Sequence, residues 1–114
     1  MEKNGAWGEK RACSYLKWHG YSIIETNFRC RHGEIDIIAQ KGGFLAFVEV
    51  KLRKNADFGE AKEFVHAAKQ RRIIAAASIW LSYNETELQP RFDVIEVYTE
   101  GRTVINHLIN AFEG

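Results

Sequence analysis

Three residues whose side chains could do chemistry lie within two apolar segments of the chain. Asp36 is in segment 34–39, and Glu49 and Lys51 form a Glu-x-Lys triplet in segment 44–51. Carboxylates bind Mg²⁺, which commonly takes one or two of them together with water and a substrate phosphate. A neighbouring lysine can orient the attacking water or neutralise charge that develops on the phosphate. If the three side chains meet, the sequence predicts a metal-dependent site for phosphate esters.

The Gly42-Gly43 pair decides whether these side chains meet. Two apolar runs around a Gly-Gly pair predict a β-hairpin, because both turn residues can adopt positive φ. A two-residue turn here places Asp36 directly opposite Glu49, with their Cβ atoms about 5 Å apart on one face. Lys51 shares that face because side chains on a strand alternate with a period of two. A shift of one residue in the pairing would send Asp36 to the opposite face.

Like charges directly across a strand pair are destabilising. The opposition of Asp36 and Glu49 therefore breaks a local rule, and such exceptions concentrate at functional sites. A divalent cation bound between the two carboxylates would relieve their repulsion. Spacing alone leaves an alternative open, in which these residues and Lys51 form an exposed patch without function, because acidic clusters are also often structural.

A helix is expected over residues 5–18, and it carries another acidic residue, Glu9. The apolar residues that share its face at helical spacing are Ala12, Cys13 and Leu16. That face should turn toward the core, where a carboxylate requires a cation, a hydrogen-bonding partner or an altered pKa. Glu9 is thus a candidate fourth member of the site. In the alternative interpretation it lies at the edge of the apolar stripe and reaches water or pairs with Arg29 or Arg31.

The remaining elements are expected to be three strands, a long helix and another strand. They cover residues 21–28, 34–39, 44–51, 60–82 and 92–98. A long helix that crosses between strands implies a mixed β-sheet with helices packed against it, which is an α/β fold of order αβββαβ. The segment 103–112 is apolar in part and fits either a strand or a helix.

Length and composition favour a single cytoplasmic domain. The chain has 114 residues, which is enough for one domain, residues 1–114, and too few for two. No segment approaches the about 18 consecutive apolar residues of a membrane span. The N-terminal residues lack the apolar run of a signal peptide. Cys13 and Cys30 make no disulfide framework, and we expect both to be free thiols.

The overall charge neither predicts nor excludes a nucleic-acid partner. The net charge is +1 and the pI is about 7.8, below the strongly basic range of many nucleic-acid-binding domains. Binding to nucleic acid must therefore depend on local basic clusters, and the chain has two, at residues 51–54 and 69–72. The alternative for each cluster is an ordinary solvated surface.

Several motifs resemble a known family. They are Gly8-Glu9, Asn27-Phe28-Arg29, residues 33–39, residues 47–53, Phe58-Gly59, Lys69 and Arg91-Phe92-Asp93-Val94. Together they span nearly the whole chain and look like the YraN family, a group of small bacterial proteins described as endonuclease-like. That family is similar in turn to the PD-(D/E)xK nuclease superfamily and its archaeal Holliday junction resolvases. The resemblance implies a restriction-endonuclease-like core and a nuclease that uses Mg²⁺ or Mn²⁺ to cleave DNA, with branched or structured DNA as the substrate by analogy.

The resemblance also implies a role for each site residue. By motif position, Asp36 matches the metal-binding Asp, and Glu49 and Lys51 match the (D/E)xK pair. Glu9 matches the first-helix Glu of the resolvases, so the metal ligands implied are Asp36, Glu49 and Glu9. Ile35 stands where the superfamily usually has proline, which makes the short motif less diagnostic.

Two further sets of residues concern partners. The candidate phosphate contacts are Arg29, Arg31, Arg53, Lys69 and Arg72. Such contacts would weaken as salt rises. One alternative to the enzyme is a catalytically inactive module that binds nucleic acid or a protein partner on a nuclease scaffold. Another is a homodimer formed through exposed aromatic residues such as Trp7, Trp18 or Trp80, each of which is more often simply core.

Overall fold

The first helix, α1 (Gly5–Trp18), has the predicted bounds. The structure is a computed structural model that describes residues 2–54 and 66–114. The Asn4 side chain caps α1 by accepting a hydrogen bond from the Trp7 N–H, at 3.1 Å. The chain leaves the helix through Gly20, whose φ of +89° favours glycine.

A five-stranded mixed sheet forms the centre of the molecule. Its strands are β1 (Ser22–Cys30), β2 (Gly33–Lys41), β3 (Phe44–Arg53), β4 (Gln89–Tyr98) and β5 (Ile105–Phe112). They lie side by side in chain order, and all neighbours are antiparallel except β3 and β4, which are parallel. The α/β fold with a mixed sheet is confirmed. The segment left open between strand and helix is β5, so the order is αβββαββ.

The second helix, α2 (Ala67–Tyr83), makes the crossover between β3 and β4. It begins later than predicted. His66 precedes it in an extended conformation, with ψ of 155°, so α2 cannot continue through this residue as a regular helix. Residues 60–65 of the predicted helix lie outside the described residues. Within residues 2–54 and 66–114, neither helix is long and apolar enough to cross a membrane.

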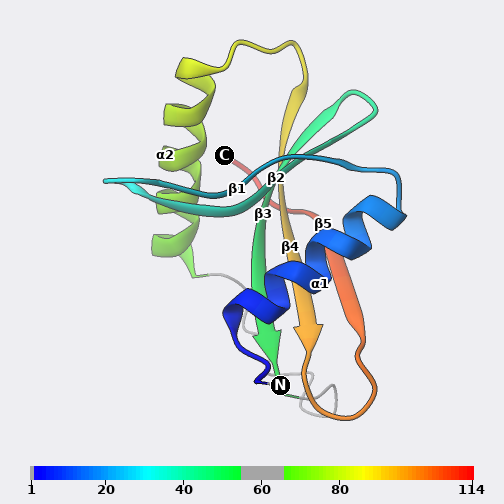
Figure 1. The fold of residues 1–114 in the computed structure, drawn as a ribbon. Helices are drawn as coiled ribbons and strands as arrows, with labels where there is room; N and C mark the ends of the chain where they lie inside the picture. Colours follow the sequence, from blue (N-terminus) through cyan, green and yellow to red (C-terminus); the bar gives the residue numbers. More distant parts are fainter. Residues whose placement is uncertain (1, 55–65) are drawn as a thin grey trace.

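The two helices cover opposite faces of the sheet (Figure 1). The main members of the α1-side cluster are Ala12, Leu16, Ile37, Val48 and Ile95. The main members of the α2-side cluster are Phe47, Ile73, Ala76, Trp80 and Phe92. Trp80 is therefore core, whereas Trp18 is 88% exposed. Because the sheet is buried on both faces, residues at its centre are shielded from water from either side.

The β2–β3 hairpin has the predicted register. Lys41 pairs with Phe44 across the turn, and the ladder continues to Ile37 opposite Val48. At the next position the two strands part: β2 continues beside β1 and β3 continues beside β4. The far end of the β1–β2 hairpin swings toward α2 (Figure 1). We call the point where β2 leaves β3 the strand fork, and Asp36 and Glu49 are the residues at it.

Candidate active site

Asp36 and Glu49 meet at the strand fork. The Val50 N–H donates a hydrogen bond of 2.8 Å to Oδ2 of Asp36, so the carboxylate takes the place of a backbone partner where the ladder has ended. The Asp36 and Glu49 carboxyl groups are close enough for each to shift the pKa of the other. Glu49 is only 7% exposed. Two acidic side chains are thus held together in a partly dehydrated place, as the hairpin register predicted.

Burial and mutual repulsion make this pair unusually basic. Burial, and after it the neighbouring Asp36 carboxylate, raise the pKa of Glu49 to about 7 against the opposing effect of Lys69 and Lys51. Burial also raises the pKa of Asp36, although the hydrogen bond from Val50 lowers it. Because the pKa of Glu49 is about 7, its carboxyl group is largely protonated below neutral pH. A bound cation would take the place of that proton.

Two lysines face the acidic pair. Lys51 lies two residues after Glu49 on β3, on the same face, because Val50 between them packs into the α1-side cluster. Lys69 comes from the first turn of α2, and its Nζ is 3.5 Å from Oε2 of Glu49. Lys69 was predicted as a phosphate contact from its place on the helix. Its ion pair with Glu49 could not be predicted from sequence, because the two residues belong to separate elements.

Glu9 lies at the edge of the inward face of α1. The centre of that face is Gly8, Ala12 and Leu16, which are buried, while Glu9 is half-buried. Gly8 packs closely on β3, since a Cβ there would come within 2.5 Å of Leu52 Cδ2. Burial raises the pKa of Glu9, a hydrogen bond from the Asn27 side chain lowers it, and the Asp36 and Glu34 carboxylates raise it. Glu9 therefore interacts with Asn27 and, more weakly, with Arg29, one of the two arginines that the sequence suggested.

Glu34 is an acidic residue that the sequence reasoning missed. Its charge raises the pKa of both Asp36 and Glu9. The sequence spacing could have indicated it, because Glu34 lies two residues before Asp36 and therefore shares its strand face. Among residues 2–54 and 66–114, no three acidic, His or Cys side chains are close enough together to form a ready metal site. The residues that could hold a cation directly are therefore the Asp36–Glu49 pair.

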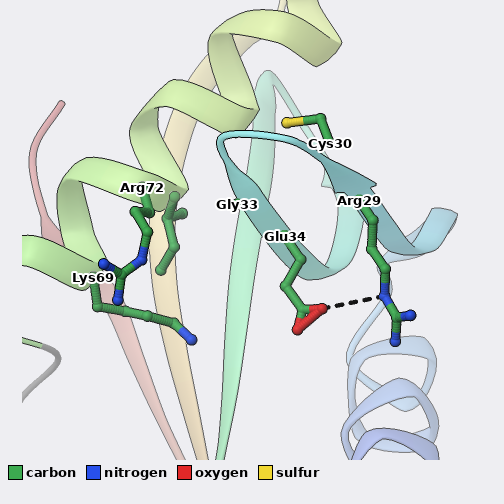
Figure 2. Close-up of a pocket in the computed structure, with 7 residues that line it drawn as sticks. Arg29, Cys30, Gly33, Glu34, Lys69 and Arg72 are labelled. Carbon is green, nitrogen blue, oxygen red and sulfur yellow. Dashed lines mark ion pairs between the residues drawn. The ribbon is translucent and has the colours of Figure 1, made fainter.

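The predicted phosphate contacts do not form one group. Arg29, Lys69 and Arg72 line a common pocket between the β1–β2 hairpin and α2 (Figure 2). Arg31 is exposed at the end of that hairpin. Arg53 is directed elsewhere: its Nε is 3.1 Å from Oε2 of the buried Glu96, and this ion pair ties β3 to β4.

Another buried acid, Asp93 on β4, was overlooked in the sequence except as part of a motif. Asp93 is fully buried and accepts hydrogen bonds from Arg91, from His107 at 2.8 Å and from the Asn110 N–H at 3.0 Å. Arg91 also donates to the Tyr21 hydroxyl, at 2.7 Å. These hydrogen-bond partners of Asp93 belong to β4 (Arg91) and to β5 (His107 and Asn110). The cluster therefore holds β5 in place and leaves the fork as the candidate active site.

Fold and site together define a small α/β domain with a mixed sheet between two helices and a buried carboxylate pair where two strands part. The chain belongs to the family described as Uncharacterised protein family UPF0102, whose sequence profile matches residues 8–97. This match confirms the YraN resemblance at the level of the family.

Relatives in this family match almost end to end. A UPF0102 protein of Caldanaerobacter subterraneus subsp. tengcongensis is 44% identical over 95% of this chain and 93% of its own length. One of Symbiobacterium thermophilum is 48% identical over 95% of this chain and 94% of its own length. One of Clostridioides difficile is 46% identical over 97% of both chains. The whole domain, including both strands of the fork, is therefore shared with these proteins.

Proposed function

We propose that this protein is a metal-dependent endonuclease that hydrolyses DNA phosphodiester bonds with Mg²⁺ or Mn²⁺. One observation carries the proposal: the carboxyl groups of Asp36 and Glu49 interact, Glu49 buried and Asp36 partly buried, with Lys51 on the same strand face. Two buried carboxylates destabilise a fold unless a proton or a cation compensates them. Mg²⁺ needs no more than one or two carboxylates when water and substrate phosphate complete its coordination. Branched or structured DNA is the expected substrate by analogy with resolvases.

Each residue of the site has a distinct task in this proposal. Asp36 and Glu49 hold the cation, and the Val50 N–H fixes the Asp36 carboxylate for that role. When bound, the cation would polarise a phosphate oxygen and lower the pKa of water. Lys51 neutralises negative charge that develops on the phosphate, an interaction that is stronger in a partly buried site than in water. Glu9, one helix away, contributes negative charge at the edge of the site.

A second candidate is a nucleic-acid- or partner-binding module that keeps this scaffold without catalysis. It is favoured by the ion pair between Lys69 and Glu49, because an ammonium group already compensates one carboxylate of the pair. In that case the acidic residues are a structural ion-pair cluster and hold no cation. Metal binding separates the two candidates.

Calorimetric titration of Mn²⁺ tests for the cation site. We expect saturable heat with the wild type and none with Asp36→Ala. Glu96→Gln is the matched control, since Glu96 is as buried as Glu49 but lies on β4 in an ion pair with Arg53. Equal heats from the wild type and Asp36→Ala would place any bound metal elsewhere and favour the binding module.

A cleavage screen tests the activity itself. Single-stranded, duplex, flap and four-way-junction DNA are incubated with Mg²⁺ or Mn²⁺, and the products are separated on denaturing gels. Glu49→Gln and Lys51→Met should each abolish cleavage, while Glu96→Gln should retain it. Cleavage that survives both site substitutions would come from another site or a contaminant. Sedimentation with and without DNA tells a monomer from a homodimer under the same conditions.

A further inference from the structure

The pocket beside the acidic pair has the chemistry of an anion site. Its volume is about 280 Å³, and it lies between the far end of the β1–β2 hairpin and the first turns of α2. Three cationic side chains line it, Arg29 from β1 and Lys69 and Arg72 from α2, together with one carboxylate, that of Glu34, which pairs with Arg29. Figure 2 shows the Lys69 and Arg72 side chains projecting from α2 on the same side of the pocket. Cations from separate elements that converge on a hollow are suited to a group such as phosphate.

The hairpin and the helix are held together closely enough to keep this shape. Gly33 lies against the helix backbone, since a Cβ at this position would come within 2.9 Å of the Arg72 carbonyl oxygen. Arg29 is oriented by Glu34, with 3.2 Å between Nε and Oε2, while its side chain remains 74% exposed. One guanidinium nitrogen is engaged, and the planar fork carries five N–H donors in total. The pocket therefore offers oriented donors on both sides.

Lys69 connects this pocket to the acidic pair. It lines the pocket, and its Nζ also lies 3.5 Å from Oε2 of Glu49. Its side chain is 37% exposed, so a flexible lysine stem can turn from the carboxylate to an anion in the pocket. The pocket and the acidic pair are therefore adjacent. Two neighbouring backbone phosphates of one DNA strand could occupy them at the same time.

We propose that the pocket lined by Arg29, Lys69 and Arg72 binds the DNA backbone phosphate next to the phosphate held at Asp36 and Glu49. The proposal rests on the proposed action on DNA and assigns the direction in which the strand leaves the site, toward α2. Lys69 pairs with Glu49 in the free protein and turns to the phosphate when the negative charge of Glu49 is neutralised. The pocket is thus completed only when the charge of Glu49 is neutralised.

Binding measured in EDTA tests this without any cleavage. The probe is a short fluorescein-labelled DNA duplex, and the readout is fluorescence anisotropy over a series of salt concentrations. Arg72→Ala should weaken binding about three- to tenfold and reduce the slope of log Kd against log salt by about one. Lys69→Met preserves most of the apolar stem and should weaken binding less than Arg72→Ala does, because in EDTA Glu49 keeps its charge and Lys69 remains paired with it. Lys17→Ala, an exposed cation at the end of α1, is the matched control and should change the affinity little.

The role of Lys69 has its own test. Glu49→Gln releases Lys69 and should bind the duplex about threefold or more tightly than the wild type in EDTA. Asp36→Asn removes the same formal charge from the same place but leaves the partner of Lys69 intact. It should therefore tighten binding less, and the effect of Glu49→Gln should vanish in a Lys69→Met background.

The two proposals fail separately. If Lys69→Met and Arg72→Ala bind like Lys17→Ala, the phosphate pocket is wrong, even when the protein cleaves DNA. Equal tightening by Glu49→Gln and Asp36→Asn would overturn the exchange of Lys69. If the variants weaken binding as expected but no DNA is cleaved with any metal, the pocket stands and the nuclease proposal falls. Arg72 is exposed, so its substitution should leave the fold intact, and circular dichroism checks this.

Discussion

Replacing Glu49 by glutamine should stabilise the metal-free protein, and the gain should grow with pH. The pKa of Glu49 is raised from 4.5 to about 7 by burial and by the Asp36 carboxylate. Between these values the folded protein keeps a proton that the unfolded chain has released. Stability contributed by such a group is fully present below the unfolded pKa and is lost as pH rises through the folded pKa. Glutamine has nearly the same shape and no charge to lose.

The size of the effect follows from the difference between the two pKa values. One pKa unit is equivalent to about 1.4 kcal/mol. A pKa of about 7 in place of 4.5 therefore limits the loss on full ionisation to about 3 kcal/mol. Glu49→Gln also deprives Lys69 of its ion-pair partner, 3.5 Å away, which reduces the gain. We expect the variant to be more stable by about 1–3 kcal/mol at about pH 8 and by about zero at about pH 4.5.

Urea unfolding in EDTA, followed by tryptophan fluorescence at a series of pH values, measures this difference. Glu96→Gln is the control of opposite sign. Burial alone would raise the pKa of Glu96, but hydrogen bonds from Asn106 and Arg53 lower it, so its removal should destabilise the protein at neutral pH. A Glu49→Gln variant that is no more stable than the wild type at about pH 8, or a gain that is independent of pH, would refute the reasoning. Mn²⁺ should stabilise the wild type more than Glu49→Gln.

Substitutions at three positions test other parts of the structure. Asp36→Ala should lower the free energy of unfolding by about 1 kcal/mol relative to Asp36→Asn, since only asparagine keeps an acceptor for the Val50 N–H; urea titration compares them. Asp93→Ala should lower the free energy of unfolding by about 3–5 kcal/mol, because it leaves the largely buried Arg91 guanidinium without its carboxylate partner. Burial raises the pKa of Asp93, but hydrogen bonds from His107 and Arg91 outweigh this effect and lower the pKa below its ordinary value of 3.8. The stability that Asp93 contributes is therefore present above pH 3.8 and is lost in more acidic solution, which an acid titration of the folded protein measures. Gly33→Ala should push the hairpin away from α2 and weaken duplex binding in the anisotropy assay, because its Cβ would meet the Arg72 carbonyl oxygen at 2.9 Å.

Features that depend on near neighbours in the chain were predictable. The bounds of α1 follow from an apolar stripe, and the positions of β2 and β3 follow from apolar runs that stop at glycines, although both strands run two residues past their predicted C-terminal ends. The hairpin register follows from counting outward from a two-residue turn, in which Gly42 has the expected positive φ of +58°. That count was enough to bring Asp36 and Glu49 together before any tertiary information was used.

Boundaries and faces set by packing were less predictable. The start of α2 at Ala67 was wrong by several residues, because helical periodicity continues through His66 in the sequence while its backbone is extended. Glu9 interacts with Asn27 of β1. Asn27 has a positive φ of 56°, and no pattern of apolar residues in the sequence indicates this conformation.

The sequence by itself determined that a carboxylate pair and a lysine share one face of a hairpin, because strand alternation and a two-residue turn are local rules. Only the tertiary structure decided what surrounds that pair. The strand fork, the ion pair from Lys69 to Glu49 and the pocket between Gly33 and Arg72 join segments far apart in the chain. Their geometry depends on how the sheet twists and how α2 crosses it, which is set by the packing of the whole core and cannot be counted from one residue to the next.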